Sequence, residues 1–200
     1  MAQLAEGRKP SSAPGKDAGE QILGAAYELF CTRGIGAVGV DAIIERSGVA
    51  RQTLYRRFGS KQDLVLAVLE RRDQVWTRDW LQAEIECRSS DPGERLLAIF
   101  DVFDEWFRTP DFEGCAFINV LLEHPDPADP INQAAVGYLE AIRGLLEPLA
   151  VAAGVADPDN FTRQWHIMMK GSIVSAGEGD VDAARRAKEM ARLLLATSLA

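Results

Sequence analysis

The chain has 200 residues, of which 47% are hydrophobic and 26% charged, the proportions of an ordinary globular protein. This length suffices for one large domain or two small ones with buried cores, which excludes a disulfide-stapled miniprotein. No uncharged apolar run approaches the ~20 residues of a membrane span, and the polar N-terminal segment lacks the apolar core of a secretory signal. We therefore expect no membrane partner and a cytoplasmic location.

Charge divides the chain into two unlike parts. The formal net charge is -8, which by itself disfavours a polyanionic partner. Residues 1–72, however, hold 11 Lys and Arg against 8 Asp and Glu, whereas residues 73–200 hold 11 against 22. An anionic partner is therefore expected to meet the N-terminal part only. The three cysteines are odd in number and widely spaced, which predicts reduced thiols rather than a disulfide framework.

Helical spacing of apolar residues recurs along the chain, and no run shows the strict alternation of a strand bounded by turn residues. The fold is therefore predicted to be all-α, with about nine helices. They are expected over residues 18–33, 41–47, 51–58, 61–87, 92 to near 110, 113–123, 130–152, 159–176 and 181–198. Residues 1–17 are predicted to form a disordered tail.

Several helix boundaries carry local signals. Ser60 is placed to cap the helix that starts at Lys61, which at ~1.5 Å per residue reaches roughly 40 Å, enough to join two domains. Gly34 is expected to end the first helix, and Pro92 to open the helix that follows Asp91. Pro148 is expected to bend the last turn of the helix over 130–152.

The most informative stretch covers residues 40–64, VDAIIERSGVARQTLYRRFGSKQDL. It contains two short helices separated by a tight turn at Gly48, the arrangement of a helix-turn-helix. The residues expected to be buried together are Ala42, Ile43, Val49, Leu54 and Phe58. Residues 46–61 hold five basic residues and no acid, which in an acidic chain favours phosphate binding.

The exposed face of the second short helix offers side chains suited to DNA. We expect Arg51 and Gln52, at its N-terminal end, to read base edges, because arginine pairs with guanine and glutamine with adenine. Thr53 offers a methyl group to thymine. The phosphate-binding candidates are Tyr55, Arg57 and Lys61, and Arg56 completes the exposed basic face.

This region resembles the TetR family of bacterial transcriptional regulators. The similarity runs from about Gln21 to Leu69: Phe-x-x-x-Gly at 30–34, Ala-Ile-x-x-x-Ser-Gly-Val at 42–49, Thr-Leu-Tyr at 53–55, Phe58, and Ser-Lys-x-Asp-Leu at 60–64. The resemblance implies a helix-turn-helix DNA-binding domain over residues 18–64 and a helical ligand-binding and dimerisation domain over residues 65–200. It further implies a homodimer, a palindromic double-stranded DNA operator and a small-molecule effector.

Three positions depart from the family pattern. Ala50 stands where a serine or threonine often caps the recognition helix, at a loss of about 1 kcal/mol. Gly39 likewise replaces a hydroxyl residue before the preceding helix. Arg57 replaces a frequent histidine and adds positive charge.

Aromatic residues recur in the second half of the chain, where they suit either an ordinary core or the wall of an apolar cavity. The resemblance implies a ligand pocket there, with a few polar residues among the apolar ones. The candidate ligand-binding residues are Phe103, Trp106, Phe107, Cys115, Phe117, Asn119, Tyr138, Trp165, His166 and Met169.

Small residues mark the last two helices: Gly171, Ser172 and Ser175 on one, and Ala184, Ala187 and Ala191 on the other. They suit either packing within the chain or a dimer interface, and the family resemblance favours the interface.

Other signals are weak. Gly34, Gly36 and Gly39 spell the G-x-G-x-x-G of dinucleotide-binding proteins, but they follow a helix rather than a strand. No metal site is expected, because the two histidines are 42 residues apart and no zinc-binding spacing occurs. With no catalytic constellation and no cofactor motif, the chain is predicted not to be an enzyme.

The sequence thus predicts a TetR-like regulator, a repressor, released from its operator by a small, largely apolar ligand. Two alternatives stay open: a helical module that binds DNA non-specifically or binds proteins, and a helical enzyme.

Overall fold

The computed structural model of the chain describes residues 17–199. The tail expected over residues 1–17 lies outside this range except for Asp17. The described residues form helices, and their one β-bridge is an isolated pair between Val155 and Leu199. The prediction of an all-α fold is therefore confirmed. The contacts divide the chain into two compact units, one ending at Leu64 and the other beginning at Val65.

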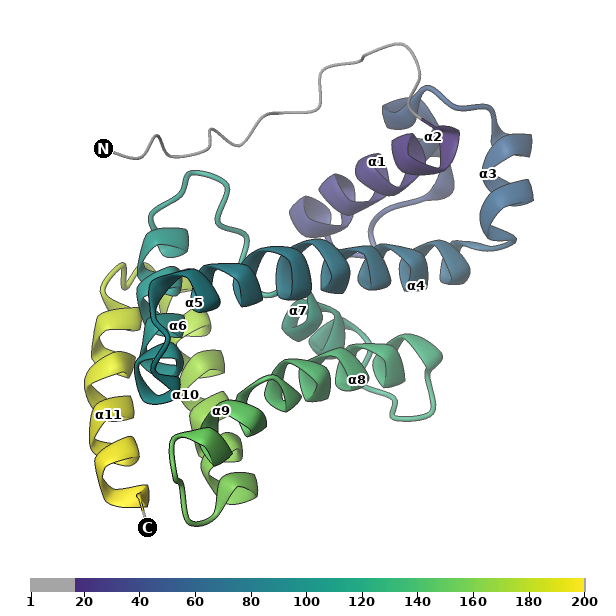
Figure 1. Cartoon of the computed structure of the whole chain (residues 1–200). Coiled ribbons are helices and arrows are strands. Elements are labelled where there is room, and N and C mark those ends of the chain that lie inside the picture. The colour runs from purple at the N-terminus through teal and green to yellow at the C-terminus, as the bar shows by residue number, and fades with distance from the viewer. Residues whose placement is uncertain (1–16, 200) are drawn as a thin grey trace. The chain divides into compact units, whose positions relative to one another are not determined.

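The first unit is a small helical head (Figure 1). Its elements are α1 (Ala18–Arg33), α2 (Val40–Ser47), α3 (Arg51–Phe58) and the first residues of α4 (Lys61–Arg72). Each of the first three helices contributes a large side chain with no exposed surface: Ile22 from α1, Ile43 from α2 and Leu54 from α3. The three helices therefore share one core.

Local chemistry ends the helices of the head close to the predicted positions. Gly48 ends α2 with φ 69°, and its N–H donates to the carbonyl of Ile44 at 2.9 Å. Only glycine adopts this left-handed conformation at little cost. The backbone N–H of Asp63 donates to Ser60 Oγ at 3.0 Å, so Ser60 caps α4 as predicted.

The second unit is a helical body that continues from α4. Its elements are η1 (Asp73–Gln82), α5 (Ala83–Arg88), α6 (Pro92–Phe107), α7 (Ala116–Glu123), α8 (Pro130–Gly144), α9 (Leu146–Ala152), α10 (Pro158–Gly177) and α11 (Ala183–Ser198). Helix α6 is central, because it contacts α5, α9, α10 and α11 (Figure 1). Asp91 caps this helix by accepting the N–H of Glu94 at 2.9 Å, next to Pro92.

Aromatic side chains fill the centre of the body. Phe100 and Phe103 of α6 and Trp165 of α10 are almost fully buried. The ring centroids of Phe100 and Trp165 are 5.5 Å apart, and those of Phe161 and Trp165 are 5.1 Å apart. Such tilted aromatic pairs stabilise the core beyond the area they bury.

Helix α11 packs on α6 through small residues and ion pairs. Ala184, Ala187 and Ala191 are buried within the chain. Lys188 Nζ lies 2.5 Å from Asp101 Oδ2. The small residues on α11 therefore pack inside their own chain, which is the alternative to the interface favoured from the sequence.

Two predicted helices are interrupted. The helix expected over 61–87 runs as α4, then the π-helical η1, then α5, and the helix expected over 130–152 breaks at Leu145 into α8 and α9. Pro148 thus lies in the first turn of α9 rather than bending a last turn. A proline is tolerated there, because the first N–H groups of a helix have no partner within it. Counting each interrupted run once, the described residues form nine helical runs.

Candidate nucleic-acid interface and ligand cavities

Helix α3 presents one polar face to solvent. Leu54 is its one buried residue, and Thr53 and Phe58 are half-buried. The exposed residues are Arg51, Gln52, Tyr55, Arg56 and Arg57. The structure therefore brings five of the seven predicted DNA-binding residues together on an exposed surface, beside the half-buried Thr53. This surface, residues 51–57 of α3, is the basic face.

Acidic residues from outside α3 pair with two of its basic residues. Arg51 forms an ion pair with Asp41 of α2, and Arg57 forms one with Asp17, next to the start of α1. All four side chains are about half or more exposed. An anion that binds either arginine must therefore compete with this carboxylate partner.

Arg46 has a structural role. Its guanidinium donates to both carboxylate oxygens of Glu28, with Nη2 2.7 Å from Oε1 and Nε 3.1 Å from Oε2. The hydrogen bonds and the charge of Glu28 raise the pKa of Arg46. Two donors in one plane suit a carboxylate, so this pair connects α2 to α1.

Lys61, the seventh candidate, lies at the start of α4 and is half-buried. Its Nζ donates to the carbonyl of Ile35 at 2.6 Å, in the loop between α1 and α2. An ammonium group has three donors, so two N–H groups stay available to a phosphate. Arg56 differs from the other four basic residues of 46–61, because it forms no ion pair or hydrogen bond with the described residues.

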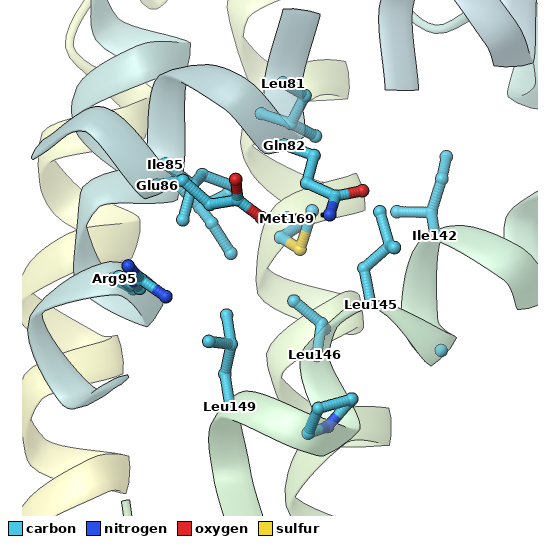
Figure 2. Close-up of a pocket in the computed structure, with 13 residues that line it drawn as sticks. Leu81, Gln82, Ile85, Glu86, Arg95, Ile142, Leu145, Leu146, Leu149 and Met169 are labelled. Carbon is cyan, nitrogen blue, oxygen red and sulfur yellow. Dashed lines mark hydrogen bonds between the residues drawn. The ribbon is translucent and has the colours of Figure 1, made fainter. Parts of the chain in front are cut away.

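The body contains an apolar cavity of about 300 Å³, which we call the aliphatic cavity (Figure 2). Its walls are mainly aliphatic, from Leu81, Ile85, Ile99, Ile142, Leu145, Leu146, Leu149 and Met169. Three polar side chains join them: Gln82, Glu86 and Arg95. Gln82 Nε2 donates to Glu86 Oε1 at 3.0 Å, and Arg95 Nε donates to the carbonyl of Ser89 at 2.6 Å. A few polar groups in an apolar wall are typical of a small-molecule site.

Four of the predicted ligand-binding residues converge elsewhere. Phe103, Cys115, His166 and Met169 line a small space of about 20 Å³. Burial raises the pKa of the Cys115 thiol. Burial, together with the positive charges of Lys170 and Arg143, lowers the pKa of His166 to about 4. Of the ten candidates, Met169 also lines the larger cavity.

The other candidates lie in packed or exposed positions. Trp106 and Phe107 belong to an aromatic cluster in which Trp76 and Trp106 are 4.8 Å apart between ring centroids. Phe117 stacks on Tyr138 at 5.1 Å. Trp165 is buried in the core, and Asn119 is exposed, with Nδ2 3.4 Å from the carbonyl of Glu113.

Sequence reasoning missed most of the larger cavity because it followed aromatic residues, whereas the walls are aliphatic. One signal was present: Gln82 and Glu86 are four residues apart, which places them on one face of the helix predicted over 61–87. Within residues 17–199, no cluster of three or more His, Cys, Asp or Glu could hold a metal ion. None of the helices in the described range is long and apolar enough to cross a membrane.

Known proteins are similar to this chain both in the head and over most of its length. Residues 22–68 match the family model described as bacterial regulatory proteins, tetR family. The HTH-type transcriptional regulator YjdC of Escherichia coli is 27% identical over 177 residues, which are 85% of this chain and 91% of YjdC. The HTH-type transcriptional activator FasR of Mycolicibacterium smegmatis is 32% identical over 141 residues, 70% of this chain and 63% of FasR.

A solved structure shows the same architecture. The TetR-family regulator SCO4454 from Streptomyces coelicolor superposes with a TM-score of 0.81 at 27% identity, covering 90% of this chain and 95% of that one. The fold, the basic face and these similarities define a DNA-binding transcriptional regulator with a helix-turn-helix, and not an enzyme. The chain belongs to the TetR family, as its sequence motifs predicted.

Proposed function

We propose that this chain is a homodimeric repressor that binds a palindromic operator and is released by a small, largely apolar ligand. The basic face of α3 carries the proposal, because it places exposed polar side chains on a short helix above one buried leucine. Arg51 and Gln52, in the first turn, read base edges in the major groove. Tyr55, Arg57 and Lys61 bind phosphates, and Arg56 is the basic residue already available for one.

An exposed apolar surface supports the dimer. Val174 of α10 is 50% exposed, and Met190 and Leu193 of α11 are 54% and 71% exposed. Helices α10 and α11 are in contact, and exposed apolar side chains on neighbouring helices suit a protein interface. Two heads related by a two-fold axis would read half-sites about 34–36 Å apart. The homodimer therefore requires a near-palindromic operator.

The aliphatic cavity supports the effector. A volume of about 300 Å³ lies at the lower end of the range for small-ligand sites. Leu81 and Gln82, in its wall, belong to η1, which continues the α4 helix along the chain from the head. A ligand that prefers one conformation of this wall by roughly 1–3 kcal/mol would change operator affinity 5- to 150-fold.

Footprinting on the DNA that flanks the gene for this chain tests the proposal. The expected result is a symmetric protected site, together with a complex of two chains. Scrambled DNA bound as tightly would instead indicate a module that binds DNA non-specifically. A reporter gene behind the protected site gives the sign of regulation, and repression in the cytoplasm of the host is the expected outcome.

A further inference from the structure

A second hollow lies on the surface of the body, apart from the aliphatic cavity. It is a groove of about 450 Å³ between α7, α8 and α10, and we call it the α8–α10 groove. Four apolar side chains line it: Leu121, Val136, Leu139 and Ile167. Ile167 is 65% exposed and Val136 37%, so part of this apolar wall is open to solvent.

Basic side chains line the same groove. Arg143 comes from α8, and Arg163 and Lys170 come from α10, where they lie seven residues apart on one face of the helix. Glu140 is the one acidic residue in the lining. This is a local reversal of charge, because residues 73–200 hold 22 acidic and 11 basic residues.

The basic residues are not equally available. Asp159 lies beside two of them, 2.9 Å from Arg163 Nε and 3.8 Å from Arg143 Nη1. Lys170 is half-buried and forms no ion pair or hydrogen bond with the part of the chain that the structure describes. A partly desolvated ammonium without a counter-ion attracts an anion more strongly than a fully exposed one.

The side chain of His166 forms part of the wall between the groove and the interior. It lines the groove together with Lys170, and both also line the small space beside Cys115. The low pKa of His166, about 4, reflects its burial and the positive charges of Lys170 and Arg143. The inner end of the groove thus combines the apolar Leu139 with the positive charge of Lys170. The neutral imidazole of His166 closes it and offers one further hydrogen-bond donor.

We propose that the α8–α10 groove binds a small anionic amphiphile, such as a carboxylic acid with an apolar chain. The carboxylate contacts Lys170 and Arg143, and the chain covers Leu139, Val136 and Ile167. An uncharged apolar ligand leaves Lys170 without a partner, and a small inorganic anion leaves the apolar wall uncovered. This proposal is independent of operator binding and of the ligand in the aliphatic cavity.

Calorimetry on the full chain with octanoate, 1-octanol and octylammonium tests the class of ligand. Octanoate is expected to bind at least about tenfold more tightly than either of the others, because only its carboxylate accepts charge-assisted hydrogen bonds from Lys170 and Arg143. Lys170→Gln is expected to weaken octanoate binding about tenfold. Arg192→Gln, the same charge change at an exposed residue of α11, is the matched control and should leave octanoate binding unchanged.

A second readout locates the site. The protein has two histidines, so the His166 ring proton in an NMR spectrum is assigned by the loss of the other signal in His124→Gln. Octanoate is expected to shift the His166 signal in the wild type and in Arg95→Gln, which alters the aliphatic cavity instead. Octanoate binding that is lost in Arg95→Gln but kept in Lys170→Gln would overturn the proposal. Octanol bound as tightly as octanoate would also overturn it. So would a wild type that binds no octanoate while Lys170→Gln dissociates into monomers, because Lys170 would then serve the contact between chains.

Discussion

Asp41 is predicted to weaken DNA binding because it forms an ion pair with Arg51. The two side chains form an ion pair, and they are 83% and 55% exposed. An exposed ion pair is worth about 0.2–1 kcal/mol, so two heads give roughly 0.4–2 kcal/mol. If Arg51 exchanges Asp41 for DNA, Asp41→Asn should raise operator affinity about 2- to 30-fold at low salt.

Glu45→Gln is the matched control for this prediction. Glu45 lies on the same short helix, is exposed, and forms no ion pair or hydrogen bond within residues 17–199, so its substitution changes the net charge equally. Fluorescence anisotropy of a labelled operator at 50 and 200 mM salt measures both variants. The difference between them should shrink at the higher salt, because screening weakens exposed ion pairs.

A double mutant isolates the contact between the two residues. In an Arg51→Ala background, Asp41→Asn should no longer raise affinity beyond the effect of Glu45→Gln. Asp41 lies in the first turn of α2, so the thermal stability of the head is measured for each variant to detect a loss of helix stabilisation. Equal affinities of Asp41→Asn and Glu45→Gln would refute the exchange of Asp41 for DNA.

Three further predictions concern the head and the body. Leu54→Ala should destabilise the head by about 2–5 kcal/mol and abolish operator binding while the body stays folded, whereas Gln52→Ala should leave the melting curve unchanged. Gly48→Ala should cost about 1–2 kcal/mol in chemical denaturation, because its φ is 69°. Unfolded His166 takes up a proton below its ordinary pKa of 6.5, whereas the folded residue does so only near 4. Stability should therefore fall by up to about 3 kcal/mol from pH 6.5 to 4, and His166→Gln, but not His124→Gln, should remove this slope.

Helix positions were predictable from sequence because their signals are local. Ser60 caps α4 by accepting the N–H of Asp63, three residues on, and Pro92 directly follows the capping Asp91. Apolar spacing likewise identified Leu54 as the inner side of α3. Each of these signals involves residues within about one helical turn, so they can be read without knowing the tertiary fold.

The interruptions were not predictable in the same way. The apolar spacing through Asp73–Gln82 is compatible with an ordinary helix, whereas the structure has a π-helical run there, which is a rare conformation. Similarly, Leu145 separates α8 from α9 although Pro148 alone suggested a bend. Gln82 of η1 and Leu145, between α8 and α9, both lie in the wall of the aliphatic cavity, so its place could not be found from residue types alone.

The ion pairs of the head show the same limit and affect function most directly. The sequence shows five basic residues and no acid between 46 and 61, yet folding brings Asp17, Glu28 and Asp41 to three of those residues. Non-specific DNA offers Arg51 a phosphate in exchange for a carboxylate, which changes the free energy little. An operator also offers a base edge, which accepts two hydrogen bonds from the guanidinium. Breaking the pair with Asp41 costs the same free energy in either complex. On the proposed role of Arg51, a base edge offsets this cost more fully than a phosphate does, so Arg51 is expected to leave Asp41 more completely at an operator than on non-specific DNA.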